Sequence, residues 1–248
     1  MVKLSKRMKA VAAMVTARGV LADIGTDHGY VPIALMEKKH ITRAIAMDIN
    51  EGPLERAKAN IAANHMEEYI ETRLSDGVAA LGVGEADSIL IAGMGGELII
   101  RILTDGEEVC ANAKELILQP QSDIRKVREY LRLHHYKIMD EDMIFEDGKY
   151  YPMMRVEKNT ASEVVWKKMS EGTKIACDTY GPLLLKNANP TLRRYLVKQH
   201  KQLNQLISNL KKQPESEAIL KRIEELQEEL FCNESAYTRL GAIKNAGI

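Results

Sequence analysis

Acidic residues and glycines alternate in one short segment, Asp23-Ile-Gly25-Thr-Asp27-His-Gly29. An apolar β-like run precedes it and a helical pattern follows, which is where doubly wound α/β folds bind nucleotides. A dinucleotide loop starting at Gly25 would need glycines at positions 27 and 30, which hold Asp27 and Tyr30. The Asp27 carboxylate would also face the pyrophosphate that such a loop cradles. The segment therefore favours a phosphate-free, positively charged cofactor, and S-adenosylmethionine fits this description.

Acids and glycines also end the next three β-like runs. Asp48 lies 23 residues beyond Gly25, where an acid is expected to accept hydrogen bonds from ribose hydroxyls. Asp76 ends the third run and is placed to accept a hydrogen bond from an adenine amino group. One such acid alone is equally well explained as a turn or cap residue, but their repetition predicts a cofactor site. The expected cofactor-binding residues are Asp23, Gly25, Asp27, Gly29, Asp48, Asp76, Gly77 and Gly93.

The elements that must position these residues alternate between strands and helices, which predicts a parallel sheet. Strands are expected at residues 20–24, 43–47, 70–74, 88–92 and 115–119. Helices are expected at residues 5–18, 30–39 and 53–64, from about Glu97, and from a Ser122 cap. Asp147-Gly148 between two apolar runs predicts a hairpin, so the sheet should end with an antiparallel strand. Residues 1–158 are therefore expected to form a Rossmann-like α/β domain.

After residue 158 the strand patterns stop, and from Ser162 onward the pattern is helical. Two apolar stripes with spacings of three, four and seven flank a break at Gln213-Pro-Glu-Ser216. The stripes are Leu192, Leu196, Leu203, Leu206 and Leu210, and Ile219, Ile223, Leu226, Leu230 and Tyr237. They predict a C-terminal domain, residues 159–248, with an α-helical antiparallel coiled-coil hairpin.

The formal net charge is zero, but its distribution is uneven. Residues 1–158 carry a net charge of −4 and the remainder +4, and residues 179–214 contain seven Lys or Arg and no acid. Such a face suits a nucleic-acid backbone, although a solvated helix face or a dimer contact gives the same pattern. The expected RNA-binding residues are Lys6, Arg7, Lys186, Arg193, Arg194, Lys198 and Lys201.

Composition also disfavours several classes of protein. No apolar run approaches the length of a membrane span, and the first residues lack a secretory signal. The three cysteines are far apart and odd in number, which suggests neither a disulfide framework nor a metal site. We therefore expect a cytoplasmic protein with no membrane partner and no required metal. We also expect it to be a monomer.

The chain resembles the bacterial tRNA methyltransferases that modify N1 of adenine 22. The resemblance lies in Ala22-Asp-Ile-Gly-Thr-Asp-His-Gly-Tyr30, Ile91-Ala-Gly-Met-Gly-Gly96, Leu118-Gln-Pro-Gln-Ser122, Glu146-Asp-Gly-Lys149 and the helical hairpin. It implies a class I S-adenosylmethionine-dependent methyltransferase fold with tRNA as substrate. It also implies an aspartate, here Asp27, where the usual cofactor loop has its middle glycine.

Methyl transfer from a sulfonium is an in-line displacement, so positioning of the acceptor is the protein's main task. Methylation of adenine N1 leaves a positive charge, which a carboxylate or an aromatic face stabilises. Asp27 and Tyr30 are therefore the catalytic candidates, with His28 as a general base, a substrate contact or a structural residue. Two other functions fit the same pattern: a small-molecule methyltransferase with the hairpin as lid or dimer arm, and a non-enzymatic cofactor sensor.

Overall fold

The computed structural model describes residues 2–159 and 170–245. The chain divides into two compact units, Met1–Val164 and Val165–Ile248. The expected domain boundary after residue 158 stays a prediction, because residues 160–169, including the expected helical start at Ser162, lie outside the described residues.

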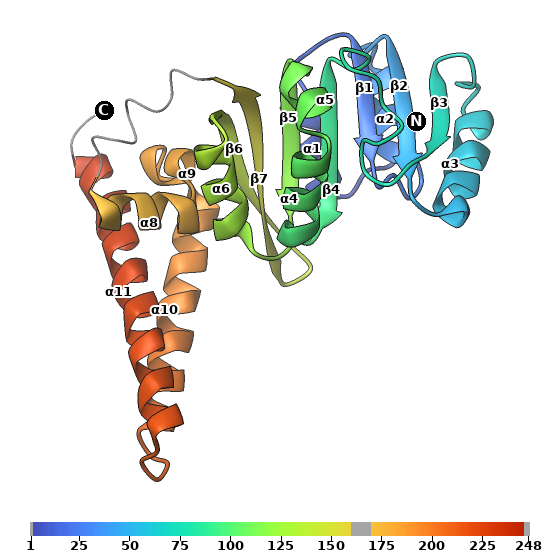
Figure 1. The fold of residues 1–248 in the computed structure, drawn as a ribbon. Coiled ribbons are helices and arrows are strands. Elements are labelled where there is room, and N and C mark those ends of the chain that lie inside the picture. The colour runs from blue at the N-terminus through green and yellow to red at the C-terminus, as the bar shows by residue number, and fades with distance from the viewer. Residues whose placement is uncertain (1, 160–169, 246–248) are drawn as a thin grey trace. The chain divides into compact units, whose positions relative to one another are not determined.

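A seven-stranded sheet forms the centre of the first unit (Figure 1). Its strands are β1 (Val20–Ile24), β2 (Arg43–Asp48), β3 (Ile70–Leu74), β4 (Ser88–Met94), β5 (Glu115–Pro120), β6 (Tyr136–Glu146) and β7 (Lys149–Lys158). Their spatial order is β3-β2-β1-β4-β5-β7-β6. The strands from β3 to β5 pair in parallel, and β7 pairs antiparallel with both β5 and β6. The strand order reverses between β1 and β4, and sheets of this kind bind ligands at the carboxyl ends of such strands.

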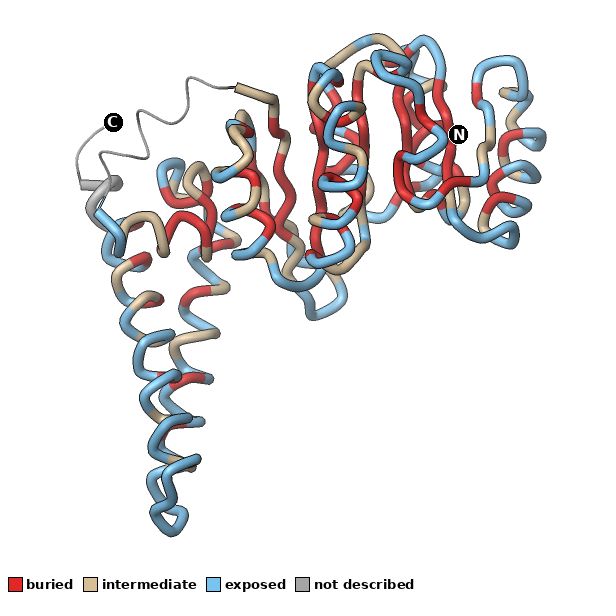
Figure 2. The backbone as a smooth tube through the Cα atoms, in the orientation of Figure 1, coloured by how far each residue is buried: buried red, intermediate tan, exposed pale blue. Residues whose placement is uncertain are grey.

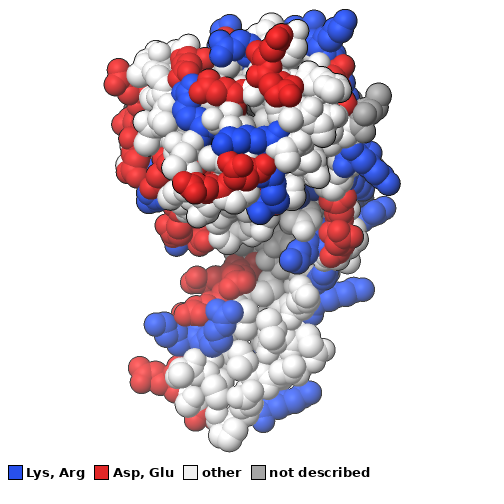
Figure 3. All heavy atoms as spheres, turned by 90° about the vertical axis from the view of Figure 1, so that its right-hand side faces the viewer, with Lys and Arg blue, Asp and Glu red and all other residues white. Residues whose placement is uncertain are grey.

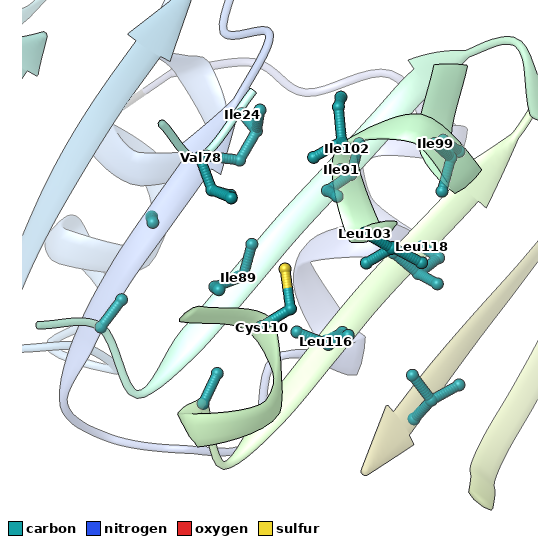
Figure 4. Close-up of a cluster of buried hydrophobic side chains, with 14 of the residues drawn as sticks. Ile24, Val78, Ile89, Ile91, Ile99, Ile102, Leu103, Cys110, Leu116 and Leu118 are labelled. Carbon is teal, nitrogen blue, oxygen red and sulfur yellow. The ribbon is translucent and has the colours of Figure 1, made fainter. Parts of the chain in front are cut away.

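Helices cover both faces of this sheet (Figure 1). They are α1 (Lys6–Met14), α2 (Tyr30–Glu37), α3 (Glu51–Ala63), α4 (Gly96–Asp105), α5 (Glu107–Asn112) and α6 (Ile124–Leu133). Neighbouring residues of β4 point to opposite apolar layers: Ile89 packs with α4, α5 and α6, and Leu90 packs with α1, α2 and α3. Figure 4 shows the first of these layers, and Figure 2 shows that burial is concentrated on the central strands. A strand covered on both faces reads as a continuous apolar run, as β4 does.

The sequence predicted most of these elements correctly. β1 and β3 have the expected bounds, β2, β4 and β5 run one or two residues further, and the hairpin at Asp147-Gly148 is confirmed. The predicted end of the first helix near residue 18 is wrong, because α1 ends at Met14. The backbone N–H groups of Thr16 and Ala17 instead donate to the buried Glu115 carboxylate, at 2.8 and 2.9 Å.

The second unit is helical in its described part. Its helices are α8 (Glu171–Tyr180), α9 (Pro182–Lys186), α10 (Pro190–Leu210) and α11 (Glu217–Asn245). Leu203 and Ile207 of α10 bury against Leu226 of α11, and Asn233 donates to the backbone oxygen of Leu196 at 3.1 Å. Because contacts move backwards along α11 as they move forwards along α10, the two helices form an antiparallel hairpin.

The predicted inner stripes of this hairpin need two corrections. Leu206 is 48% exposed, and Ile207 takes its place inside. Tyr237 is 38% exposed, whereas the polar Asn233 is buried and hydrogen bonded. The coiled-coil packing itself stays a prediction. Among the described residues, no helix is both long and apolar enough to cross a bilayer.

Candidate active site

The loop between β1 and α2 lies at the carboxyl edge of the sheet. The backbone N–H groups of Gly25 and Thr26 both donate to the Met47 oxygen at the end of β2, at 2.8 and 2.9 Å. Gly25 has a φ of 76°, which glycine adopts without strain, and the Met94 side chain of β4 lies against its open face. Gly29 is the N-cap of α2. The loop is therefore fixed between the ends of β2 and β4.

Two carboxylates meet beside this loop. Asp23 of β1 is 8% exposed, and burial raises the pKa of its carboxyl to about 6, against a lowering by the neighbouring Thr26 side chain. The negative charge of Asp48 at the end of β2 raises this pKa further. Asp48 is half-buried, and its Oδ1 accepts the backbone N–H of Asn50 at 2.8 Å. Two acids of which one is buried favour a ligand that brings positive charge and hydroxyl donors.

The three catalytic candidates form one group at the start of α2. Oδ2 of Asp27 lies 3.1 Å from Nε2 of His28, whose ring stacks on that of Tyr30 at a centroid distance of 5.0 Å and an interplanar angle of 10°. Oδ1 of Asp27 accepts hydrogen bonds from Arg56 of α3, including one from Nε at 3.0 Å. The sequence did not predict this role for Arg56. Its positive charge offsets the negative charge of Asp27. Tyr30 is 39% exposed, so its ring is open to a ligand.

An arginine also holds the expected adenine contact. Both oxygens of Asp76 accept hydrogen bonds from Arg101 of α4, at 2.9 and 3.0 Å, and this pairing lowers the pKa of Asp76. A carboxylate has further acceptor positions, so the pairing leaves capacity for an adenine amino group. A side chain at Gly77 would meet Ile102 at 2.9 Å, so close packing on α4 explains this glycine.

The end of β4 is fastened to the loop after β5. The Gln121 N–H donates to the Met94 oxygen at 2.8 Å, and the Gly96 N–H donates to Oγ of Ser122 at 3.3 Å. The predicted capping role of Ser122 is wrong, because the N-cap of α6 is Asp123. Gly93 is exposed beside these contacts. Gly25 and Gly29, which follow β1, and Gly93, near the end of β4, therefore lie on one edge of the sheet.

The expected RNA-binding residues fall into two sets, one in each unit. Arg7 reaches this edge of the sheet, whereas Nζ of Lys6 lies 3.5 Å from the Phe145 oxygen. In the second unit, Lys186 ends α9, and the exposed members of α10 border a surface hollow of about 610 Å³. These members are Arg193, Arg194, Lys198 and Lys201. Figure 3 shows that both signs of charge are interspersed on the displayed face of the first unit.

Two kinds of site residue were beyond sequence reasoning. Arg56 and Arg101 pair with acids 29 and 25 residues away, and no periodicity or motif connects them to those acids. Gln119, fully buried in β5, accepts a hydrogen bond from Arg7 across 112 residues.

Across the described ranges, no group of three or more His, Cys, Asp or Glu side chains is placed to hold a metal ion.

Comparison with known proteins gives similarities over most of the chain. The methyltransferase domain family matches residues 4–154. The tRNA (adenine(22)-N(1))-methyltransferase of Bacillus subtilis (strain 168) is 31% identical over 231 residues, 92% of this chain and 94% of that protein. The crystal structure of the B. subtilis m1A22 tRNA methyltransferase TrmK has a TM-score of 0.83 at 30% identity, covering 95% of this chain and 99% of that chain. Streptococcus pneumoniae Sp1610 in complex with S-adenosyl-L-methionine has a TM-score of 0.81 at 31% identity, covering 95% and 100%.

Proposed function

Because the chain belongs to the tRNA (adenine(22)-N1)-methyltransferase family, we propose that it transfers the methyl group of S-adenosylmethionine to N1 of adenine 22 in tRNA. The observation that carries this proposal is the acidic, phosphate-incompatible site at the switch point between β1 and β4. A buried Asp23 and a strand-end Asp48 suit the ammonium and ribose of this cofactor, and Asp27 occupies a position where a dinucleotide loop needs glycine.

The chain's own residues hold and orient the reactants. Asp23 attracts the cationic end of the cofactor, Asp48 accepts from its ribose, and Asp76 accepts from its adenine. Asp27, whose charge Arg56 offsets, contributes as a hydrogen-bond acceptor beside them. When bound, the cofactor supplies an electrophilic methyl group on a sulfonium. Adenine N1 attacks with its own lone pair, so the protein needs no base for this step. The exposed ring of Tyr30, stacked on His28, offers a π face to the positively charged product.

Incubation with labelled S-adenosylmethionine and unmodified tRNA, followed by digestion to nucleosides, tests this function. We expect the label in N1-methyladenosine, and none when adenine 22 is replaced by guanine. Turnover without RNA would favour the small-molecule alternative. Cofactor binding without methylation of RNA or of any small molecule would leave only a sensor role.

The exposed cations of α10 support a tRNA-binding role for the second unit. Arg193, Arg194, Lys198 and Lys201 lie within three turns of one helix, and residues 179–214 contain no acid. Phosphate contacts of this kind set affinity and position rather than base specificity. We propose that the enzyme acts in the cytoplasm as a monomer. It should require no metal, because a sulfonium leaves without Lewis-acid help.

Removing charge from this face should flatten the salt dependence of tRNA binding. Each phosphate contact that is lost reduces the slope of log K against log salt by about 0.7–0.9. We therefore expect Arg194→Gln with Lys198→Gln and Lys201→Gln to reduce the slope by about 2, measured by filter binding from 50 to 300 mM salt. Arg193 stays unchanged, because its guanidinium lies 5.5 Å from the ring centre of Tyr237. Lys221→Gln, exposed on α11, is the control, and equal slopes in all three proteins would contradict the role.

The raised pKa of Asp23 makes cofactor affinity depend on pH. Between pH 7 and 5 its carboxyl, with a pKa of about 6, takes up a proton and loses its attraction for an ammonium group. We expect S-adenosylmethionine binding to weaken about tenfold over this range, in which the cofactor's amino group stays protonated. Calorimetry at several pH values checks this.

Asp23→Asn should bind more weakly at pH 7 and lose most of this pH dependence. Glu67→Gln removes an exposed carboxylate outside the site and should keep it. An affinity that is constant from pH 5 to 7 in the unmodified protein would rule out an ionised Asp23 as a cofactor ligand.

A further inference from the structure

Arg7 of α1 reaches the carboxyl end of β4. Its Nη1 lies 3.5 Å from the position that a Cβ would take at Gly93. Gly93 is exposed, and β4 is paired with β1, which carries the cofactor loop. The guanidinium therefore lies at the carboxyl end of β4, next to the switch point between β1 and β4, near which the acceptor of the methyl group must be placed.

Groups from β5 and β7 hold the Arg7 side chain in this position, and a group from β6 holds its backbone. Nη1 donates to Oε1 of the fully buried Gln119 at 2.7 Å, and Nε2 of Gln119 donates to the Pro120 oxygen at 3.0 Å. The Pro120 contact fixes the amide so that its oxygen faces Arg7. The guanidinium carbon lies 5.3 Å from the ring centre of Tyr151, and the backbone N–H of Arg7 donates to Glu146 at 3.1 Å. Such a supported side chain is already oriented before a ligand arrives.

Most donors of this guanidinium are available to a ligand. An arginine has five N–H donors, and within residues 2–159 and 170–240 Gln119 accepts the one hydrogen bond that the guanidinium makes. The Glu146 carboxylate accepts from the backbone N–H groups of Lys6 and Arg7. The neighbouring arginines at this edge differ, because Arg56 pairs with Asp27 and Arg101 with Asp76. Arg7 therefore presents a positive charge that forms no salt bridge within the described residues, although the Glu146 carboxylate lies near enough to interact with this charge.

The charge at this place selects the kind of ligand. Methylation of adenine N1 makes the base positive, so a cation directly on the base would oppose the reaction. A guanidinium instead binds phosphate well, through two parallel charge-assisted hydrogen bonds. N1 lies on the Watson-Crick edge, so a paired or stacked adenine must leave the helix, and its backbone must then be held.

We propose that Arg7 binds the tRNA phosphate on the 5′ or 3′ side of the adenosine that is methylated, and so positions that nucleotide beside Gly93. This inference rests on the proposed function. Gln119 is a positioning residue for Arg7, since it touches the guanidinium from its buried side. The role differs from that of α10, because it concerns the reacting nucleotide and not the affinity for the whole tRNA.

A double-substitution cycle between protein and RNA tests the proposal. The protein variants are Arg7→Gln, which removes the charge, and Arg7→Lys, which keeps it without the fork. The RNA variants carry one uncharged methylphosphonate, either 5′ or 3′ of adenosine 22. With unmodified tRNA, Arg7→Gln should lower kcat/KM about 10- to 100-fold, the loss typical of hydrogen bonds to a charged partner, and Arg7→Lys should lower it less. Lys38→Gln, an exposed lysine just after α2 at the opposite edge of the sheet, should match the unmodified enzyme.

The deciding readout is the interaction between the two changes. One of the two methylphosphonates should slow the unmodified enzyme at least tenfold and cause no further loss in Arg7→Gln. Fully multiplicative losses at both phosphates would overturn the proposal, as would a loss of S-adenosylmethionine binding by Arg7→Gln in calorimetry. If the unmodified enzyme does not methylate tRNA, the proposed function fails first, and the cycle distinguishes that outcome from a failure of this inference alone.

Discussion

Asp48→Ala should weaken S-adenosylmethionine binding roughly 100-fold, equivalent to about 3 kcal/mol lost with charge-assisted hydrogen bonds to the ribose. Asp48 ends β2 at the carboxyl edge, and its Oδ1 accepts the Asn50 N–H at 2.8 Å, which orients the carboxylate. The remaining acceptor positions are therefore fixed before the ligand binds. Isothermal titration calorimetry at pH 7.5 measures the change directly.

Asp48→Asn separates the charge of this residue from its shape. The amide oxygen can still accept from Asn50, so the turn is kept, and we expect an intermediate loss of about tenfold. Because the charge of Asp48 raises the pKa of Asp23, this variant should also move the weakening of binding to a lower pH. An affinity within threefold of the unmodified protein in both variants would remove Asp48 from the cofactor site.

Local sequence patterns were sufficient to predict the sheet, because each strand is recognisable from its own residues. β4 is an apolar run bounded by turn residues, and Asp147-Gly148 marks the hairpin without reference to the rest of the chain. α1 shows where this reasoning stops. Its apolar positions continue past Met14, but Glu115 captures the N–H groups of Thr16 and Ala17 from 98 and 99 residues away. When a distant carboxylate determines where a helix ends, the sequence of the helix itself contains no signal for that end.

The site residues, too, were only partly predictable from the sequence. The acids at strand ends were predictable, because parallel strands bring their carboxyl ends to one edge whatever the details of packing. Their partners were not, because Arg56 and Arg101 stand on exposed helix faces that look like any solvated surface. Arg7 was assigned to RNA from charge alone, and its place beside Gly93 emerged only with the contact to Gln119. In the second unit, Ile207 rather than Leu206 points inward, a choice between adjacent apolar residues that the spacing left open.

Arg128→Met should lower the free energy of unfolding by about 3–5 kcal/mol, the loss typical of removing one member of a buried ion pair. Arg128 lies in α6 together with three further basic residues, so the sequence suggests that it is a surface position. Its side chain is 1% exposed, and Nε donates to Oε1 of the fully buried Glu141 at 2.9 Å. The stability of a domain is itself about 5–15 kcal/mol, so this loss is a large share of it. Urea unfolding at pH 7 measures the change, and Arg125→Met, exposed on the same helix, should stay within about 0.5 kcal/mol.

Replacing both partners tests whether charge or shape is responsible. In Arg128→Met with Glu141→Leu no buried charge is stranded, and apolar side chains of similar length fill the space between α6 and β6. The double variant should therefore recover most of the loss, because a buried pair gains little over a well-packed apolar one once desolvation is counted. The expected interaction energy between the two substitutions is about 2–3 kcal/mol. Additive losses would mean that the guanidinium and the carboxylate act through separate contacts and that the pair does not fasten α6 to the sheet.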